Sequence, residues 1–327
     1  MKLPSLSVVV PNFNHARHLP RCLGALLVQS VPPTQIVVVD DGSTDDSVEV
    51  IRGLARQNPS VRLLQNERNL GVTAAVNRGV EAAAGDFVYL QGADDEILPG
   101  FIEKTLRLLA EHPKAGLACT IGDWRELHTG IHWHMGLGMT DHPAFLDPSE
   151  VLRLEKRGRL FIPGHTAVYR RDALIRAGIL IAGLRHYSDW FSTLVVAFRH
   201  GICVVPEPLA IFNIESDTYY QRNRRNRESN EAAIEHALEL LHEPAYADVA
   251  GPFRDSAALY VCGLGMLRVL SRHAAYRHFL TPRLLRKTLW HVSRVGLKQC
   301  APAFLVNWYA GVAGYRHSPI QPRPEKR

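Results

Sequence analysis

The first 120 residues alternate between short apolar runs and longer segments whose apolar residues recur at helical spacing. The apolar runs lie at residues 6–10, 36–39, 61–64 and 87–90, and each has the length and composition of a buried strand. Helical patterns follow these runs at residues 18–28, 48–54, 70–84 and 99–109. Repeated units of this kind predict an α/β fold in which helices cover both faces of a mostly parallel sheet.

The pattern is less regular after residue 116. We expect a strand at 117–121, a loop or hairpin at 131–145, partly helical segments at 168–184 and 189–200, and short strands at 204–205 and 209–212. A basic run then leads into helical patterns that continue to about residue 312. The sequence therefore predicts an α/β domain at 1–220, a helical C-terminal extension at 221–317 and a disordered, proline-rich tail at 318–327.

Charge and cysteine content limit the classes of partner and compartment. The formal net charge of +6 suits anionic partners such as nucleotide phosphates or an acidic membrane face, although a mildly basic surface is the simpler explanation. The five cysteines are widely separated and include no C-x-x-C pair, which favours a reducing compartment. No apolar run reaches the ~20 residues of a membrane helix, and no signal peptide precedes the first strand. We expect a cytoplasmic protein that does not bind nucleic acid, because the basic residues form no recognised module.

Polar side chains follow three of the predicted strands. Residues 11–14 follow the first strand, 40–41 the second and 94–95 the fourth. In an open parallel sheet, ligands bind beyond the carboxyl ends of the strands, so these side chains are expected to share one site. Neighbouring carboxylates repel each other unless a cation or ligand joins them. The pattern therefore indicates a binding site that contains paired acids.

The chemistry of a nucleotide diphosphate fits such a site. A diphosphate approaches several carboxylates only through a divalent cation, and Mg²⁺ or Mn²⁺ is bound by one or two carboxylates together with phosphate oxygens. Asp94 and Asp95 are the candidates for that role. Asp40 can accept a hydrogen bond from a base N–H or a ribose hydroxyl. The residues thus predict a metal-dependent site for a nucleotide diphosphate.

Four motifs occur in a fixed order along the chain. They are residues 8–14, residues 36–45, residues 69–72 with Ala75, Asn77 and Gly79, and residues 93–95. This set resembles the inverting family-two glycosyltransferases of the GT-A fold, strongly over 5–112 and weakly over 113–215. The resemblance implies transfer of a sugar from a nucleotide diphosphate donor, such as a UDP-sugar, to a hydroxyl acceptor. The acceptor would be a sugar or a lipid-linked sugar in polysaccharide or glycoconjugate biosynthesis.

The resemblance also implies roles for individual residues. Ribose contact is implied for Asp94 and metal contact for Asp95. An exposed helix surface explains Asn77 equally well. The residues that the resemblance assigns to nucleotide binding are Pro11, Asn12, Phe13, Asp40, Asp41, Asn77 and Asp94.

The sequence departs from the family at two positions that bear on chemistry. Gly92 stands where the family usually has the first Asp of an Asp-Ala-Asp-Asp motif, so metal binding would depend on fewer carboxylates. Ser188 replaces Glu in the Glu-Asp pair that carries the family's catalytic base, which leaves Asp189 as the candidate base. A carboxylate there would take the proton from the acceptor hydroxyl. The alternative role for Asp189 is that of a helix N-cap.

A basic amphipathic helix is predicted at residues 283–298. Leucines and valines group on one side of its helical wheel, and lysines, arginines and a histidine on the other. Such a helix packs on the catalytic domain, or it contacts the anionic lipids of the inner membrane face as a peripheral anchor.

Two other functions compete with sugar transfer. One is a nucleotide-sugar-binding protein without turnover, which Gly92 and Ser188 favour. The other is a nucleotidyltransferase on a similar sheet, which would need a Gly-rich, basic loop after the first strand; residues 11–15 are not such a loop. The absence of a G-x-G-x-x-G motif argues against a dinucleotide-dependent dehydrogenase.

Overall fold

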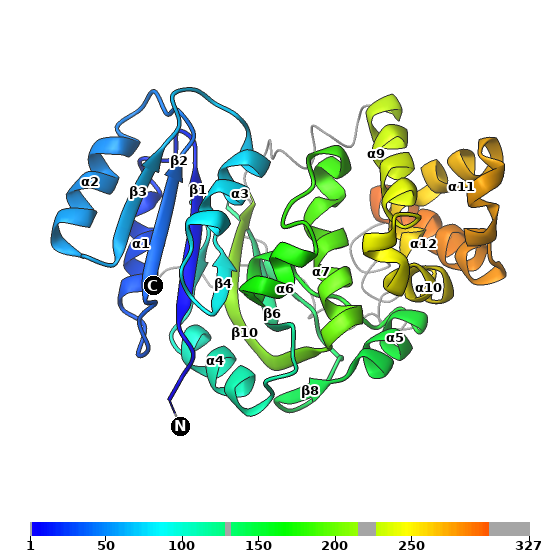
Figure 1. Cartoon of the computed structure of the whole chain (residues 1–327), viewed down its shortest axis with the longest axis horizontal. Helices are drawn as coiled ribbons and strands as arrows, with labels where there is room; N and C mark the ends of the chain where they lie inside the picture. The colour runs from blue at the N-terminus through cyan, green and yellow to red at the C-terminus, as the bar shows by residue number, and fades with distance from the viewer. Residues whose placement is uncertain (1, 128–131, 215–226, 301–327) are drawn as a thin grey trace.

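The computed structural model describes residues 2–127, 132–214 and 227–300, and it places a helix-covered sheet beside a group of C-terminal helices (Figure 1). Within these residues ten strands form one sheet in the order β3-β2-β1-β4-β9-β6-β10-β5, with β7 beside β6 and β8 beside β10. The strands are β1 (Leu6–Asn12), β2 (Gln35–Asp40), β3 (Val61–Gln65), β4 (Phe87–Leu90), β5 (Glu96–Ile97), β6 (Leu117–Glu126), β7 (His132–Met135), β8 (Ala144–Leu146), β9 (Val168–Arg170) and β10 (Ile202–Ile214).

The first four strands are parallel, as the sequence predicts. Strand β1 pairs with β2 on one side and β4 on the other, so it is central. Val8, Val9 and Val10 are fully buried because helices cover both faces of this part of the sheet. The pairing sets Asn12 directly opposite Asp40 at the carboxyl ends of β1 and β2.

Helices cover the sheet on both sides. Helices α1 and α4 pack on the face that carries Val8 and Val10, and α3 packs on the face that carries Val9. The alternation follows from the two-residue period of a strand, which sends successive side chains to opposite faces. In the part of the chain that the structure describes, the helices are α1 (Leu19–Leu27), α2 (Ser47–Gln57), α3 (Val72–Ala82), α4 (Phe101–Glu111), α5 (Pro148–Lys156), α6 (Arg171–Arg176), α7 (Ser188–His200), α9 (Arg227–Leu240), α10 (Ala247–Ser256), α11 (Gly263–Arg272) and α12 (Pro282–Cys300).

The second half of the sheet contains both parallel and antiparallel pairs. Strand β9 inserts antiparallel between β4 and β6, at the start of the segment 168–184 that the sequence predicts to be partly helical. Helix α6, which starts at Arg171, lies within that segment. The two short strands expected at 204–205 and 209–212 are parts of one strand, β10. The register of β10 shifts around Pro208, because proline has no N–H to donate to the neighbouring strand.

The C-terminal helices share a core with the sheet. Phe253 of α10 lies 5.3 Å from Phe191 and 5.4 Å from Phe198 of α7, measured between ring centroids. Figure 1 shows α9 to α12 gathered on the side of α7 that faces away from β1. The predicted boundary at residue 220 and the predicted tail at 318–327 lie outside the described residues. None of the described helices combines the length and the apolar character that crossing a membrane requires.

We expect Gly79→Ala to destabilise the fold, because α3 approaches β1 closely at this glycine. A Cβ at Gly79 would lie 2.3 Å from Cγ1 of Val9 and 3.1 Å from Cγ2 of Val39. Overpacking of this kind costs about 1–3 kcal/mol. Urea unfolding measures the loss, with Gly53→Ala in α2 as the control, since a Cβ there meets nothing within 4 Å. Equal midpoints for the two variants would contradict the packing described for α3.

Candidate functional site

The candidate site lies where β1, β2 and β4 end, at the upper edge of the sheet in Figure 1. The loop after β1 is joined to the loop after β2 by hydrogen bonds between their polar side chains and main chain. Asn14, at φ 57°, accepts a hydrogen bond from Thr44 N at 2.8 Å, and Asn14 N donates to Ser43 Oγ at 2.9 Å. The two loops therefore form one rigid wall of the site.

Asn12 and Asp40 are the last residues of β1 and β2, and together they form the buried floor of the candidate site. Asp40 is fully buried; its Oδ1 accepts from Asn12 Nδ2 at 2.9 Å and its Oδ2 from Ser43 N at 3.1 Å. The Oδ1 atom of Asn12 is also buried and has no hydrogen-bond partner among the described residues. Phe13 follows Asn12 directly after the end of β1, and 40% of its surface is exposed. A buried acceptor beside an exposed aromatic ring suits a planar base that carries N–H donors.

Asp41 and Asn77 use their polar atoms within the protein. The carboxylate of Asp41 accepts hydrogen bonds from Asn66 Nδ2, Leu70 N and Gly71 N at 2.6–2.9 Å, which orders the start of α3. The amide of Asn77 donates to Leu180 O at 2.8 Å and accepts from Leu180 N at 3.1 Å. Both residues thus have positioning roles, and their predicted contact with a nucleotide stays a prediction.

Asp94 and Asp95 lie in a tight turn after β4, and their carboxylates converge beside Gly92. A Cβ built on Gly92 would lie 2.7 Å from Oδ2 of Asp95 and 3.0 Å from Oδ1 of Asp94. The aspartate that the family usually has at this position would therefore displace one of the two carboxylates. Glycine at position 92 thus leaves the space that the carboxylates of Asp94 and Asp95 need in this arrangement.

Asn213, near the end of β10, makes two hydrogen bonds to the turn that contains Asp94 and Asp95. Its main-chain N–H donates to Oδ1 of Asp95 at 2.9 Å, and its side chain donates to the carbonyl of Asp94 at 2.7 Å. Arg21 of α1 donates to the same carbonyl at 2.8 Å. No motif in the sequence indicates this role of Asn213.

Asp95 is 4% exposed, and burial is the main reason that its pKa lies well above the usual range for an aspartate. The negative charge of Asp94 raises the pKa further. Ionising both side chains in this turn is unfavourable without a compensating positive charge.

The two carboxylates fit a divalent cation that also binds a diphosphate. No group of three or more His, Cys, Asp or Glu side chains in the described part of the chain could enclose a metal ion. Mg²⁺ and Mn²⁺ do not need such an enclosure when phosphate oxygens complete the coordination. Asp95, with Asp94 beside it, is the group that would hold the ion.

Asp189 is the second residue of α7 and is not its N-cap. The N-cap is Tyr187, and Oδ1 of Asp189 accepts a hydrogen bond from Trp190 N at 2.8 Å. The other oxygen, Oδ2, faces Gly164, where a Cβ would lie 3.1 Å away. Solvent reaches Asp189, but the protein surrounds it closely on its other sides, and this desolvation raises the pKa of its carboxyl.

The segment before Asp189 is fixed by several contacts. Ser188, which replaces the family's Glu, is buried and accepts a hydrogen bond from Ile181 N. Ile179 and Arg185 both have positive φ values, 53° and 52°, which cost energy in non-glycine residues. The Asn77–Leu180 hydrogen bonds attach this strained segment to α3. The position of Asp189 is therefore set by the protein core.

A group of aromatic rings lies between the acidic turn, which contains Asp94 and Asp95, and Asp189. The His165 ring is 5.2 Å from the Phe212 ring and 4.6 Å from the Trp124 ring. Burial lowers the pKa of His165 to about 3, so its imidazole is neutral at physiological pH. Since Phe212 precedes Asn213 and His165 follows Gly164, a continuous chain of neighbours connects Asp95 with Asp189. Sequence spacing gave no indication that these rings form one group.

The sequence of the chain matches the family model described as Glycosyl transferase family 2 over residues 7–178. The chain belongs to this family. It is 34% identical to the uncharacterized glycosyltransferase YibD of Escherichia coli over 193 residues, which are 58% of this chain and 55% of that protein. It therefore spans only about half the length of that relative. A glycosyltransferase of Nostoc, also uncharacterized, is 25% identical over 89% of this chain and 87% of its own length.

Solved structures share the fold of this family member. S. aureus TarS in complex with UDP-GlcNAc has a TM-score of 0.58 and 17% identity, over 95% of this chain and 88% of TarS. The mannosyltransferase PcManGT of Pyrobaculum calidifontis in complex with GDP-Man and Mn²⁺ has a TM-score of 0.53 and 18% identity, over 89% and 88% of the two chains. Both likenesses confirm the predicted α/β fold with its C-terminal helical region.

We expect Asp95→Asn to stabilise the metal-free protein increasingly as pH rises. The folded-state pKa of Asp95 is raised, so its ionisation costs stability; the cost is absent below the unfolded pKa of about 4 and grows as pH rises toward the folded pKa. Thermal midpoints in excess chelator at pH 5, 6.5 and 8 measure the effect. The control is Asp46→Asn, at an exposed aspartate before α2, measured under the same conditions. A pH-independent difference for Asp95→Asn would contradict this burial argument.

Proposed function

We propose that this protein transfers a sugar, with inversion, from a nucleotide diphosphate donor to a hydroxyl acceptor in a metal-dependent reaction. The observation that carries the proposal is the acidic turn. The half-buried carboxylate of Asp94 and the buried carboxylate of Asp95 converge beside Gly92, in the turn after β4. Strand β4 pairs with β1, whose last residue, Asn12, is hydrogen-bonded to Asp40. A nucleoside fits the floor, and its diphosphate, with a cation, fits the acidic turn.

In this proposal the chain's own residues divide the donor between them. Asp40 and Asn12 accept hydrogen bonds from the base or ribose, and Phe13 lies against the base. Asp94 contacts the ribose, and Asp95 holds the cation. When bound, Mg²⁺ or Mn²⁺ supplies positive charge that stabilises the leaving nucleoside diphosphate. Asn213 positions the acidic turn through its two hydrogen bonds.

Asp189 acts as the base in the proposed reaction. The acceptor oxygen attacks the anomeric carbon while the bond from that carbon to the diphosphate oxygen breaks. The proton of the acceptor hydroxyl moves to the carboxylate of Asp189. A raised pKa favours this role, because a carboxylate that ionises closer to neutral pH is a stronger base. A single displacement of this kind inverts the anomeric centre.

Relatives support the choice of donor class and pathway. TarS binds UDP-GlcNAc and PcManGT binds GDP-Man, so a nucleotide-sugar donor is a natural choice, and we favour a UDP-sugar. The chondroitin synthase of Pasteurella multocida is 33% identical over 106 residues, 32% of this chain and 11% of that protein. This match favours an acceptor that is a sugar or lipid-linked sugar in polysaccharide or glycoconjugate biosynthesis. A nucleotide-sugar-binding protein without turnover is the alternative, since Ser188 replaces a carboxylate beside Asp189.

We expect Asp189→Asn to keep donor binding and to lose roughly two to four orders of magnitude in turnover, the usual contribution of a general base. Asparagine can still accept the hydrogen bond from Trp190 N but cannot take a proton. The assay follows release of UDP from UDP-GlcNAc and of GDP from GDP-mannose with Mn²⁺, with water or added sugars as acceptors. Donor affinity and thermal midpoint are measured alongside.

The matched control is Asp172→Asn, since Asp172 is an exposed aspartate in the first turn of α6. It should release nucleotide as fast as the parent. Full activity of Asp189→Asn would assign the base to another residue. A parent that binds donor tightly in Mn²⁺ and releases no nucleotide with any acceptor would support the binding protein without turnover.

A further inference from the structure

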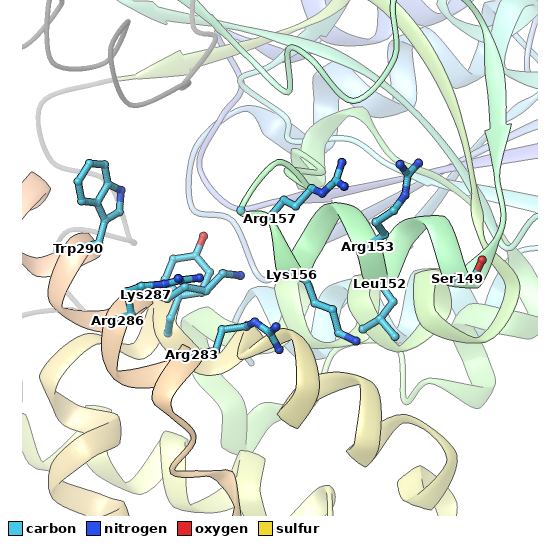
Figure 2. Close-up of a pocket in the computed structure, with 11 residues that line it drawn as sticks. Ser149, Leu152, Arg153, Lys156, Arg157, Arg283, Arg286, Lys287 and Trp290 are labelled. Carbon is cyan, nitrogen blue, oxygen red and sulfur yellow. The ribbon is translucent and has the colours of Figure 1, made fainter.

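A pocket of about 780 Å³ lies between α5 and α12. None of the residues that line it belongs to the strand-end site, the candidate site where β1, β2 and β4 end. Figure 2 shows the side chains of Lys156 and Arg283, from the two helices, at this pocket. Six of the described lining residues are cationic and none is acidic. The cationic residues are Arg153, Lys156, Arg157, Arg283, Arg286 and Lys287. The pocket is therefore strongly electropositive.

Part of this positive charge is balanced by nearby carboxylates. Lys287 pairs with Glu155 at 3.1 Å, and Arg153 lies 3.7 Å from Glu150. The remaining cations have no carboxylate within ion-pair distance among the described residues. These are Lys156, Arg157, Arg283 and Arg286. An excess of unpaired cations in a concave site attracts anions and is electrostatically unfavourable without one.

The pocket is held in shape from beneath. Lys287 donates to Ser256 O at 3.0 Å and to the main-chain carbonyl of Glu155, and its ammonium lies 4.7 Å from the centre of the Tyr260 ring. Leu284 and Thr288 are buried and anchor α12 on its other side. Lys287 thus contacts the protein, although the helical wheel groups it with the basic side of the helix and not with the apolar side. The basic side of α12 therefore also helps to pack the helix on the protein, through Lys287.

Exposed apolar side chains lie along the rest of α12. Leu285, Leu289 and Trp290 are 40%, 60% and 42% exposed. At 100° per residue, the outer surface of the helix runs from Leu285 and Leu289 across Arg286 to Trp290, which lines the pocket. Apolar groups of this size on one exposed strip, next to unpaired basic groups, are the composition of an interfacial helix.

We propose that this pocket binds the phosphate of an anionic lipid headgroup while the exposed strip of α12 lies in the membrane interface. Arginine and lysine side chains from two helices supply charge-assisted hydrogen bonds to phosphate oxygens. Leu285, Leu289 and Trp290 contribute apolar contact with the acyl boundary. The inference concerns a surface outside the strand-end site, so it does not depend on sugar transfer.

The test is co-sedimentation of the full chain with vesicles in excess chelator at low salt. The parent should sediment with vesicles of phosphatidylglycerol and phosphatidylcholine, should not sediment with phosphatidylcholine alone, and should be released by about 0.5 M salt because ions screen the attraction. The triple variant Lys156→Glu/Arg157→Glu/Arg286→Glu should bind at least about tenfold more weakly. Leu285→Ser/Leu289→Ser should also weaken binding but keep the salt dependence.

The charge-matched control reverses three exposed basic residues elsewhere: Arg56→Glu/Arg62→Glu/Lys114→Glu. Equal binding by this control and by the pocket variant would overturn the proposal, as would equal binding of the parent to neutral vesicles. If the reversed pocket variant does not fold, Lys156→Gln/Arg157→Gln/Arg286→Gln replaces it, with the same criterion. Titration with inorganic pyrophosphate in chelator separates a soluble source. A parent that binds pyrophosphate in the pocket and no vesicles would overturn the lipid assignment.

Discussion

The contact between Asn213 and the Asp94–Asp95 turn is the interaction on which the rest of the site depends. It joins the last residues of β10 to the loop after β4, which are far apart in sequence and are separated in the sheet by two other strands. The contact keeps a carboxylate buried that is unfavourable to ionise without a cation. The buried carboxylate thus lowers the stability of the metal-free protein, and a bound cation would compensate its charge. Such unfavourable features are common at functional sites.

The same logic extends from the acidic turn to the proposed base. Phe212, next to Asn213, packs against His165, and Gly164 leaves room for the carboxylate of Asp189. The strained segment before Asp189 is fastened to α3 by Asn77. The Asp94–Asp95 turn and Asp189 are therefore both positioned by residues that take no part in the proposed chemistry. This rigid support suits a reaction that depends on placing two reactants.

The sequence predicts the first half of the fold well because its strands are buried on both faces and its loops carry polar residues in order. That reasoning predicts Asp40, Asp94 and Asp95 as site residues, since strand ends meet at one edge of a parallel sheet. It does not predict the contacts of Asn213, because an isolated Asn on a strand carries no local signal for a contact more than a hundred residues away. Strand β9 was missed for a related reason: its three residues pair with β4 and β6, and such pairing is invisible to periodicity. The helical wheel of α12 could not show that Lys287, on the basic side, pairs with buried Glu155.

The central claim is that the acidic turn accepts a nucleotide diphosphate through a divalent cation, and the midpoint of thermal unfolding with UDP tests it most directly. The account predicts that UDP raises the midpoint in Mn²⁺, by an amount equivalent to about 2.7 kcal/mol at a hundred times its dissociation constant. It predicts no rise in excess chelator. An equal rise in chelator would contradict the account, because the diphosphate would then bind without the cation that Asp94 and Asp95 are proposed to hold.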